Sequence, residues 1–172
     1  GRCFVIPIAL PFLDDEEANA ARDAVLSGWV SQGPQVAAFE HEFCALVGAP
    51  YATAVSNCTT ALHLALAAIN VGPGDEVITA SHSFIATANS VRYCGATPVF
   101  VDVDPDTYNI DPLKVAEAIT PRTRAIIAVH QMGMPCDLPA LVALARQHNL
   151  VLIEDAACAA GSEIRVNGSW ER

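Results

Sequence analysis

The segment Val151-Leu152-Ile153-Glu154-Asp155-Ala156-Ala157-Cys158-Ala159-Ala160-Gly161 is the most informative stretch of this chain. It begins as an apolar run of strand type, ends that run in two adjacent carboxylates, and continues with small residues. Open α/β sheets bind ligands at the carboxyl ends of their parallel strands. A carboxylate buried there needs a cation or hydrogen-bond donors, and the protonated ring nitrogen of a cofactor is one such cation. The same pattern also fits a strand that ends in a solvated acidic turn.

The rest of the chain alternates between helical and strand patterns. Helices are expected over residues 14–27, 36–47, 59–69, 85–93, 112–119 and 139–148, and strands over 52–55, 76–79, 98–102, 125–130 and 151–154. Strands that alternate with helices of about 10–15 residues indicate βαβ units. The expected fold class is therefore α/β, with a mostly parallel sheet flanked by helices. We find no repeats or linkers and expect one α/β unit.

Composition excludes several classes of protein. The chain has 172 residues, of which 52% are hydrophobic and 16% are charged, as in a core-rich globular protein. Its formal charge of −10 argues against a nucleic-acid partner. The six cysteines form no C-x-x-C pair, so we expect free thiols, no metal site and a cytoplasmic location. The apolar run at residues 4–10 is too short and proline-broken for a signal peptide or membrane helix, so no membrane partner is expected.

A second strand-to-helix junction is Ser56-Asn57-Cys58-Thr59-Thr60. Free backbone N–H groups at a helix N-terminus, together with threonine hydroxyls, suit a phosphate group. Ordinary capping of the helix by Ser or Thr is the alternative. The chain has no G-x-G-x-x-G or G-x-x-x-x-G-K motif, which disfavours a Rossmann or P-loop nucleotide site.

A third junction is Ser81-His82-Ser83-Phe84-Ile85-Ala86-Thr87. Phe84 could lie flat against a planar aromatic ligand with His82 as a polar neighbour, or Phe84 could be a core residue and His82 a cap. Together with the segment that ends in Asp155, these junctions offer a phosphate-binding turn, an aromatic side chain that can stack on a ring and a carboxylate for a ring nitrogen. This combination describes a site for pyridoxal 5'-phosphate.

Several motifs follow one another between about Pro7 and Gly161: Gly33-Pro34, Phe39-Glu40, Ser56-Asn57-x-Thr59, Gly74-Asp75-Glu76-Val77-Ile78, Ser83-Phe84-x-Ala86-Thr87, Gly95-Ala96-x-Pro98-Val99-x-Val101-Asp102, Val129-His130 and Glu154-Asp155-Ala156-Ala157. In this order they resemble the DegT/DnrJ/EryC1/StrS family of sugar aminotransferases, which are pyridoxal-phosphate enzymes of fold type I. The resemblance implies transfer of an amino group from an amino-acid donor, glutamate, to a keto-sugar nucleotide. It also implies a homodimer with shared active sites.

The resemblance also implies roles for individual residues. Asp155 would pair with the pyridinium nitrogen, Phe84 would stack on the ring, and the Cys58-Thr59-Thr60 turn would hold the phosphate. Cys158 stands near the ring hydroxyl, where many members have Gln or His, and thiols form weaker hydrogen bonds. Cys58 likewise takes a place that in the family is often held by Gly or another small residue.

The Schiff-base lysine that the family needs has no counterpart here. Lys114 is the single lysine, and its pattern predicts an exposed helix. In the family the catalytic lysine lies downstream of Glu-Asp-Ala-Ala, so residues 1–172 are interpreted as an incomplete large domain that is inactive alone, with its C-terminal remainder absent. The resemblance also implies two strands that are missing from these residues and that lie in the sheet between the strand ending at Asp155 and the one ending at Ser56. Residues 1–50, including the Gly28–Gly33 loop, are expected to pack on the domain and to form substrate or dimer contacts.

Three alternatives remain open. The chain could be a truncated or degenerate fragment that binds a phosphorylated ligand or partner without turnover. The parent protein could be a family sugar dehydratase, in which His replaces the lysine. A nicotinamide dehydrogenase shares the βαβ layout but needs a glycine fingerprint that this sequence lacks.

Overall fold

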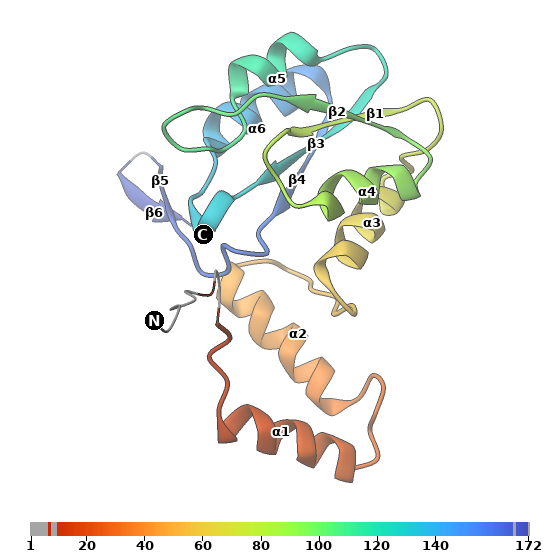
Figure 1. Cartoon of the computed structure of the whole chain (residues 1–172), viewed down its shortest axis with the longest axis vertical. Helices are drawn as coiled ribbons and strands as arrows, with labels where there is room; N and C mark the ends of the chain where they lie inside the picture. The colour runs from red at the N-terminus through yellow and green to blue at the C-terminus, as the bar shows by residue number, and fades with distance from the viewer. Residues whose placement is uncertain (1–6, 8–9, 167, 172) are drawn as a thin grey trace, which may run out of the picture. The chain divides into compact units, whose positions relative to one another are not determined.

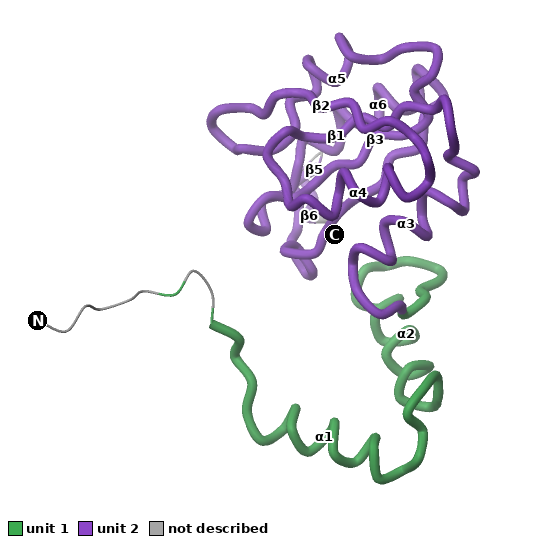
Figure 2. Tube along the Cα trace, turned by 45° about the vertical axis from the view of Figure 1, so that its right-hand side comes forward, with its two compact units in different colours: residues 1–54 green, residues 55–172 purple. Residues whose placement is uncertain are grey.

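The computed structural model describes residue 7, residues 10–166 and residues 168–171. The chain divides into two compact units, residues 1–54 and 55–172 (Figure 2). The sequence predicted one α/β unit, whereas the structure has two compact units, and all of the described strands belong to the second. The packing of residues 1–50 on the rest stays a prediction.

The first unit contains two helices, α1 (Asp15–Leu26) and α2 (Pro34–Val47). α1 begins with a capping box, in which the Asp14 side chain accepts from the Glu16 N–H and the Glu17 side chain accepts from the Asp14 N–H. α2 ends at Gly48, whose φ of 68° is left-handed and favours glycine. Neither helix has a buried residue.

The second unit is built on a four-stranded parallel sheet. Its strands are β1 (Glu76–Ala80), β2 (Thr97–Val101), β3 (Thr123–Val129) and β4 (Val151–Asp155), in the order β2-β1-β3-β4 (Figure 1). Four helices cover it: α3 (Cys58–Ala68), α4 (Ile85–Tyr93), α5 (Pro112–Ala118) and α6 (Leu138–His148). A 3-10 turn, η1 (Gln131–Gly133), follows β3. Because the strands are parallel, their carboxyl ends meet at one edge of the sheet.

The sheet is buried on both faces, as alternating residues of β1 and β3 show. Val77 and Ile127 belong to a core with residues of α3 and α4, while Ile78 and Ile126 belong to a second core with residues of α5 and α6. The second unit therefore has three layers, with α3 and α4 on one face and α5 and α6 on the other. Burial of both faces explains the continuous apolar runs of these strands.

The structure differs from the sequence prediction in two elements. Residues 52–55 form no strand, since a strand needs a hydrogen-bonded neighbour and the Ala54 N–H instead donates to Glu40 Oε1 at 2.8 Å. The antiparallel hairpin β5 (Ile164–Val166) and β6 (Ser169–Glu171) was not expected. The dipeptide Asn167-Gly168 between two β-type runs is a hairpin signal that could have predicted it.

Candidate functional site

Asp155 is the last residue of β4, and its carboxylate is buried, with 8% of the residue exposed. One carboxylate oxygen, Oδ2, accepts a hydrogen bond from the Thr87 hydroxyl at 3.1 Å. The other, Oδ1, accepts from the Ala157 N–H at 3.3 Å and from the Cys58 thiol at 3.6 Å. The side chain therefore contacts two of the predicted junctions in addition to its own turn.

All three donors to Asp155 are neutral. None of the residues that the structure describes forms an ion pair with it. A buried carboxylate is costly when no cation compensates its charge. The site thus has the electrostatic character of a place for a positively charged group.

The N-terminal turn of α3 lies at the same edge of the sheet. Asn57 caps the helix, and its Oδ1 accepts from the Thr60 N–H at 2.9 Å and from the Thr60 hydroxyl at 3.1 Å. Thr60, one of the predicted phosphate contacts, is thus engaged in capping. The N–H groups of Cys58 and Thr59 fall in the first turn, where a helix offers no acceptor of its own. Such groups suit an anion.

Cys58 links the α3 turn to the carboxylate. Burial of the thiol raises its pKa above the ordinary value, and the Asp155 charge and hydrogen bond raise it further, as does Cys158 to a smaller extent. The thiol form is therefore favoured, which keeps Cys58 a donor to Asp155.

The N-terminal turn of α4 places Phe84 and Thr87. Phe84 is the N-cap residue and is 77% exposed, so the alternative of a core phenylalanine is wrong. The Ser83 and Thr87 hydroxyls lie 2.8 Å apart, and both residues line a cavity of about 110 Å³ together with Phe84. The His82 ring lies edge-on to Tyr108 with centroids 6.2 Å apart.

Cys158 lies in the turn after β4 and is exposed. If Gly133 carried a side chain, its Cβ atom would lie 3.1 Å from the Cys158 carbonyl oxygen. The φ angle of Gly133 is also positive, at 85°. Gly133 is therefore restricted to glycine by both its backbone conformation and this close approach. The Ser162 hydroxyl also donates to the Gly133 carbonyl at 2.8 Å, which holds the loops after β3 and β4 together.

Sequence reasoning assigned no role to a buried histidine at the end of β3. His130 is 4% exposed, its Nδ1 accepts the Cys136 N–H at 3.0 Å, and its Nε2 lies 2.9 Å from Glu154 Oε2. Because Nδ1 accepts, we assign the ring proton to Nε2, which donates to Glu154. The His130 N–H also donates to the Asp155 carbonyl at 3.1 Å. The strand-end rule that singled out Asp155 applies equally to His130.

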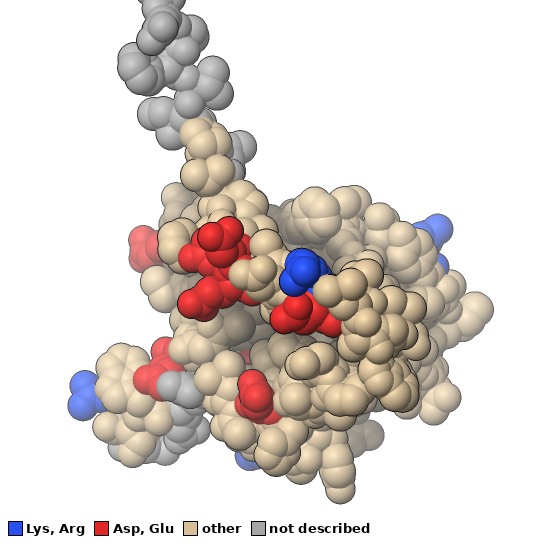
Figure 3. All heavy atoms as spheres, turned by 90° about the horizontal axis from the view of Figure 1, so that it is seen from below, with Lys and Arg blue, Asp and Glu red and all other residues tan. Residues whose placement is uncertain are grey.

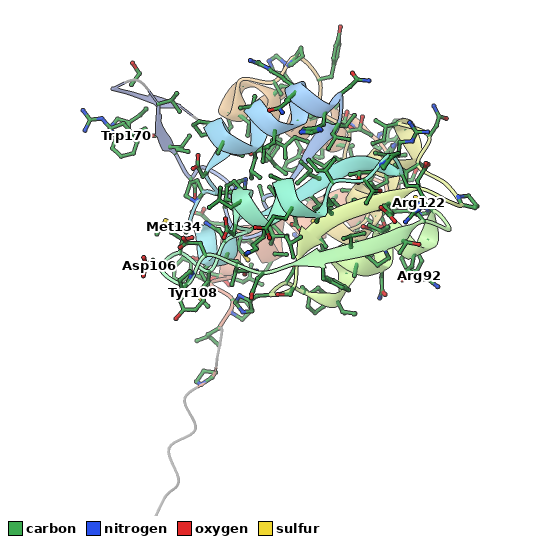
Figure 4. The ribbon with its side chains drawn as sticks, turned by 90° about the horizontal axis from the view of Figure 1, so that it is seen from above. Arg92, Asp106, Tyr108, Arg122, Met134 and Trp170 are labelled. Carbon is green, nitrogen blue, oxygen red and sulfur yellow. The ribbon has the colours of Figure 1, made fainter. Side chains whose placement is uncertain are left out.

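The loop after β2 closes the same edge of the sheet. Asn109 is 2% exposed, its Nδ2 donates to the Met134 and Pro135 carbonyls at 3.0 Å each, and its Oδ1 accepts from the Gln131 N–H at 2.9 Å. Figure 4 shows the neighbouring Tyr108 and Met134 at one end of the molecule. Asn109 therefore fixes the loop after β3, which carries Gly133 against Cys158.

The protein is acidic overall, which affects how it can bind an anion. On the face drawn in Figure 3, acidic side chains are more prominent than basic ones, in keeping with the formal charge of −10. The overall field therefore does not attract a phosphate group. Local donors, such as the first turn of α3, have to supply the attraction.

Comparison with known proteins decides which family shares this arrangement. The model of the DegT/DnrJ/EryC1/StrS aminotransferase family matches residues 11–168. The chain belongs to this family. It is 51% identical over 152 residues to spore coat polysaccharide biosynthesis protein SpsC of Bacillus subtilis, covering 88% of this chain and 39% of SpsC. It is 49% identical over 161 residues to GDP-perosamine synthase of Caulobacter vibrioides, covering 93% and 43% of the two chains.

Solved structures confirm the fold of a type I aminotransferase. The protein Spr1654 of Streptococcus pneumoniae in its PMP-form superposes with a TM-score of 0.88 at 30% identity, covering 94% of this chain and 44% of that one. The same protein was solved in a PLP-form, and DegT/DnrJ/EryC1/StrS aminotransferases use pyridoxal 5'-phosphate as cofactor. The present chain spans about two fifths of the length of the curated relatives it matches.

Lys114 lies on α5 with its side chain 47% exposed and paired with Glu117 at 2.9 Å, which confirms the prediction of a surface lysine. Among the described residues, no helix combines the length and apolar character needed to cross a membrane, and no cluster of His, Cys, Asp or Glu could hold a metal ion.

Proposed function

We propose that the chain is the cofactor-binding part of a pyridoxal-phosphate-dependent sugar aminotransferase. The reaction transfers an amino group from an amino-acid donor, glutamate, to a keto-sugar nucleotide. Family membership and relatives such as GDP-perosamine synthase support this reaction class. The observation that carries the proposal is the buried Asp155 carboxylate, which has three neutral donors and no cation among the described residues.

The residues of the site fit the cofactor. Asp155 would hold the protonated pyridinium nitrogen, a cation that none of the described residues supplies to its carboxylate. Phe84, exposed at the neighbouring junction, would stack on the ring. When bound, pyridoxal phosphate supplies an electron sink for charge that develops on the substrate, and the protonated ring nitrogen strengthens it.

The α3 turn holds the phosphate. The Cys58 and Thr59 N–H groups and the Thr59 hydroxyl are the proposed donors, while Thr60 contributes by capping the helix through Asn57. Cys158 stands near the ring hydroxyl and offers it a weak hydrogen bond.

The Schiff-base lysine is proposed to come from outside these 172 residues. Lys114 projects from α5 and pairs with Glu117, so it is not placed to serve the site. We therefore propose that the chain binds the cofactor but catalyses no amino transfer alone. The 1–172 segment acts as part of a large domain, since relatives that it matches over most of its length are more than twice as long.

The proposal also covers the partners of the enzyme and its location in the cell. The partners are a nucleotide sugar, an amino-acid donor and a second copy of the protein, with residues 1–50 contributing substrate or dimer contacts. Exposed apolar residues on α1 and α2, such as Leu26 and Phe39, support an interface role for this segment. A cytoplasmic location is supported by the free thiols of all five cysteines that the structure describes.

Titration of the 172-residue chain with pyridoxamine 5'-phosphate tests the proposal, because this form of the cofactor needs no lysine. We expect saturable binding at one site per chain by calorimetry, with competition by pyridoxal phosphate. Inorganic phosphate is the control ligand, and it should bind far more weakly. A chain with a folded near-ultraviolet circular dichroism spectrum that binds neither cofactor form contradicts the proposal. Equal binding of phosphate and cofactor favours the non-catalytic phosphate-binding alternative.

A further inference from the structure

We infer that Thr87 is a positioning residue, which holds the Asp155 carboxylate in the orientation that receives the cofactor ring nitrogen. The inference rests on the proposed cofactor site. Thr87 lies in the first turn of α4 and is 1% exposed, so solvent does not reach its hydroxyl. Its Oγ1 is 3.1 Å from Asp155 Oδ2.

The direction of the hydrogen bonds follows from the single proton of each hydroxyl. An ionised carboxylate only accepts, so the Thr87 proton points to Asp155. The Ser83 hydroxyl, 2.8 Å from Thr87 Oγ1, then has to donate to it. The result is a chain from Ser83 through Thr87 to Asp155, in which each bond polarises the next.

The second carboxylate oxygen is held from other elements. Asp155 Oδ1 accepts from Cys58 at the start of α3 and from the Ala157 N–H in its own turn. The thiol is the weakest of these donors, so Thr87 is the strongest side-chain restraint on the carboxylate plane. Restraint before the ligand arrives avoids an ordering cost on binding.

A packing role for Thr87 would give a different result from a positioning role. If Thr87 only fills space, its loss weakens every ligand of the site to the same degree. If it acts through Asp155, its loss weakens only ligands that carry the ring nitrogen. The two roles are therefore separated by a pair of ligands that differ at this one atom.

The experiment measures binding of pyridoxamine 5'-phosphate and of its analogue with C–H in place of the ring nitrogen. Thr87→Val keeps the shape of the side chain and removes the hydroxyl. We expect pyridoxamine phosphate to bind about tenfold more weakly, as for loss of a hydrogen bond to a charged group. The analogue should bind as it does to the unaltered chain. Thr87→Ser, which keeps the hydroxyl, should restore the affinity for pyridoxamine phosphate.

An equal loss for both ligands, or no loss for either, overturns the inference while leaving the proposed function intact. Absence of cofactor binding by the unaltered, folded chain overturns both. If Thr87→Val does not fold, Ser83→Ala replaces it, because Ser83 is only partly buried and donates to Thr87. A smaller loss that is specific to pyridoxamine phosphate supports the inference, and an absent or ligand-independent loss contradicts it.

Discussion

Two carboxylates at opposite edges of the same parallel sheet are buried to nearly the same extent but have different partners. Glu76, the first residue of β1, is 7% exposed, and Asp155, the last residue of β4, is 8% exposed. Glu76 accepts hydrogen bonds from the Arg122 guanidinium, at 2.9 Å from Nε, and from the Thr120 hydroxyl. Among the residues that the structure describes, the donors to the Asp155 carboxylate are all neutral.

The difference supports the proposal that Glu76 is a structural carboxylate and Asp155 a binding carboxylate. At the amino edge the neighbouring Asp75 is also paired with an arginine, Arg124, at 2.9 Å. Figure 4 shows Arg122 at the side of the molecule away from Tyr108 and Met134, which mark the carboxyl edge. Glu76, which belongs to the fold itself, has an arginine as counter-charge, whereas no described residue supplies one to Asp155. This contrast supports the proposed ligand at Asp155.

The largest expected effect comes from neutralising each carboxylate in turn. Asp155→Asn should weaken binding of pyridoxamine phosphate about a hundredfold, because an amide does not offset the charge of the ring nitrogen. Glu76→Gln should leave this affinity unchanged and lower the melting temperature, because it leaves Arg122 without its partner. Calorimetric titration and thermal unfolding of both variants measure these effects. An unchanged affinity for pyridoxamine phosphate in Asp155→Asn would contradict the proposed difference in role between Asp155 and Glu76.

Acid should weaken the hydrogen bonds of Glu76 at the amino edge. The Thr120 hydrogen bond, followed by those of Arg122, holds the pKa of Glu76 below its ordinary value of 4.5. A lowered pKa in the folded state contributes stability above the ordinary value, and this stability is lost as the pH falls below it. Arg122→Gln should therefore reduce the drop in melting temperature between about pH 7 and about pH 3.5.

Arg146→Gln, at the exposed end of α6, is the matched control for the loss of one arginine charge. Its drop in melting temperature over the same pH range should equal that of the unaltered chain. A drop in Arg122→Gln as large as in the unaltered chain would show that the Glu76 pair adds nothing to acid stability.

The smallest expected effect is on a thiol at the carboxyl edge. Burial and the Asp155 charge raise the pKa of Cys58, so alkylation by iodoacetamide at mildly alkaline pH should be slow. Asp155→Asn should speed up alkylation of Cys58 severalfold, although burial still raises its pKa. Mass spectrometry of the modified peptides measures the rates. Cys94, whose pKa is raised by burial alone, is the internal control and should react at an unchanged rate.

Sequence reasoning located the edge of the sheet at which the candidate site lies. Most predicted helices and strands agree with the structure within two residues, because their periodicity, caps and glycine ends are local signals. It did not anticipate that Thr60 is engaged by Asn57 or that residues 52–55 form no strand. Both outcomes depend on which hydrogen-bond partner a side chain or a backbone N–H group has in the folded chain.

The sequence by itself determined the α/β class, the three strand-to-helix junctions and the identity of Asp155 as a carboxylate at a strand end. Only the tertiary structure decided which donors meet that carboxylate. Thr87 and Cys58 lie 68 and 97 residues from Asp155 along the chain, and the packing of α3 and α4 on the sheet brings them to its two oxygens. Local patterns specify elements, whereas the compensation of a buried charge depends on contacts between elements distant in sequence.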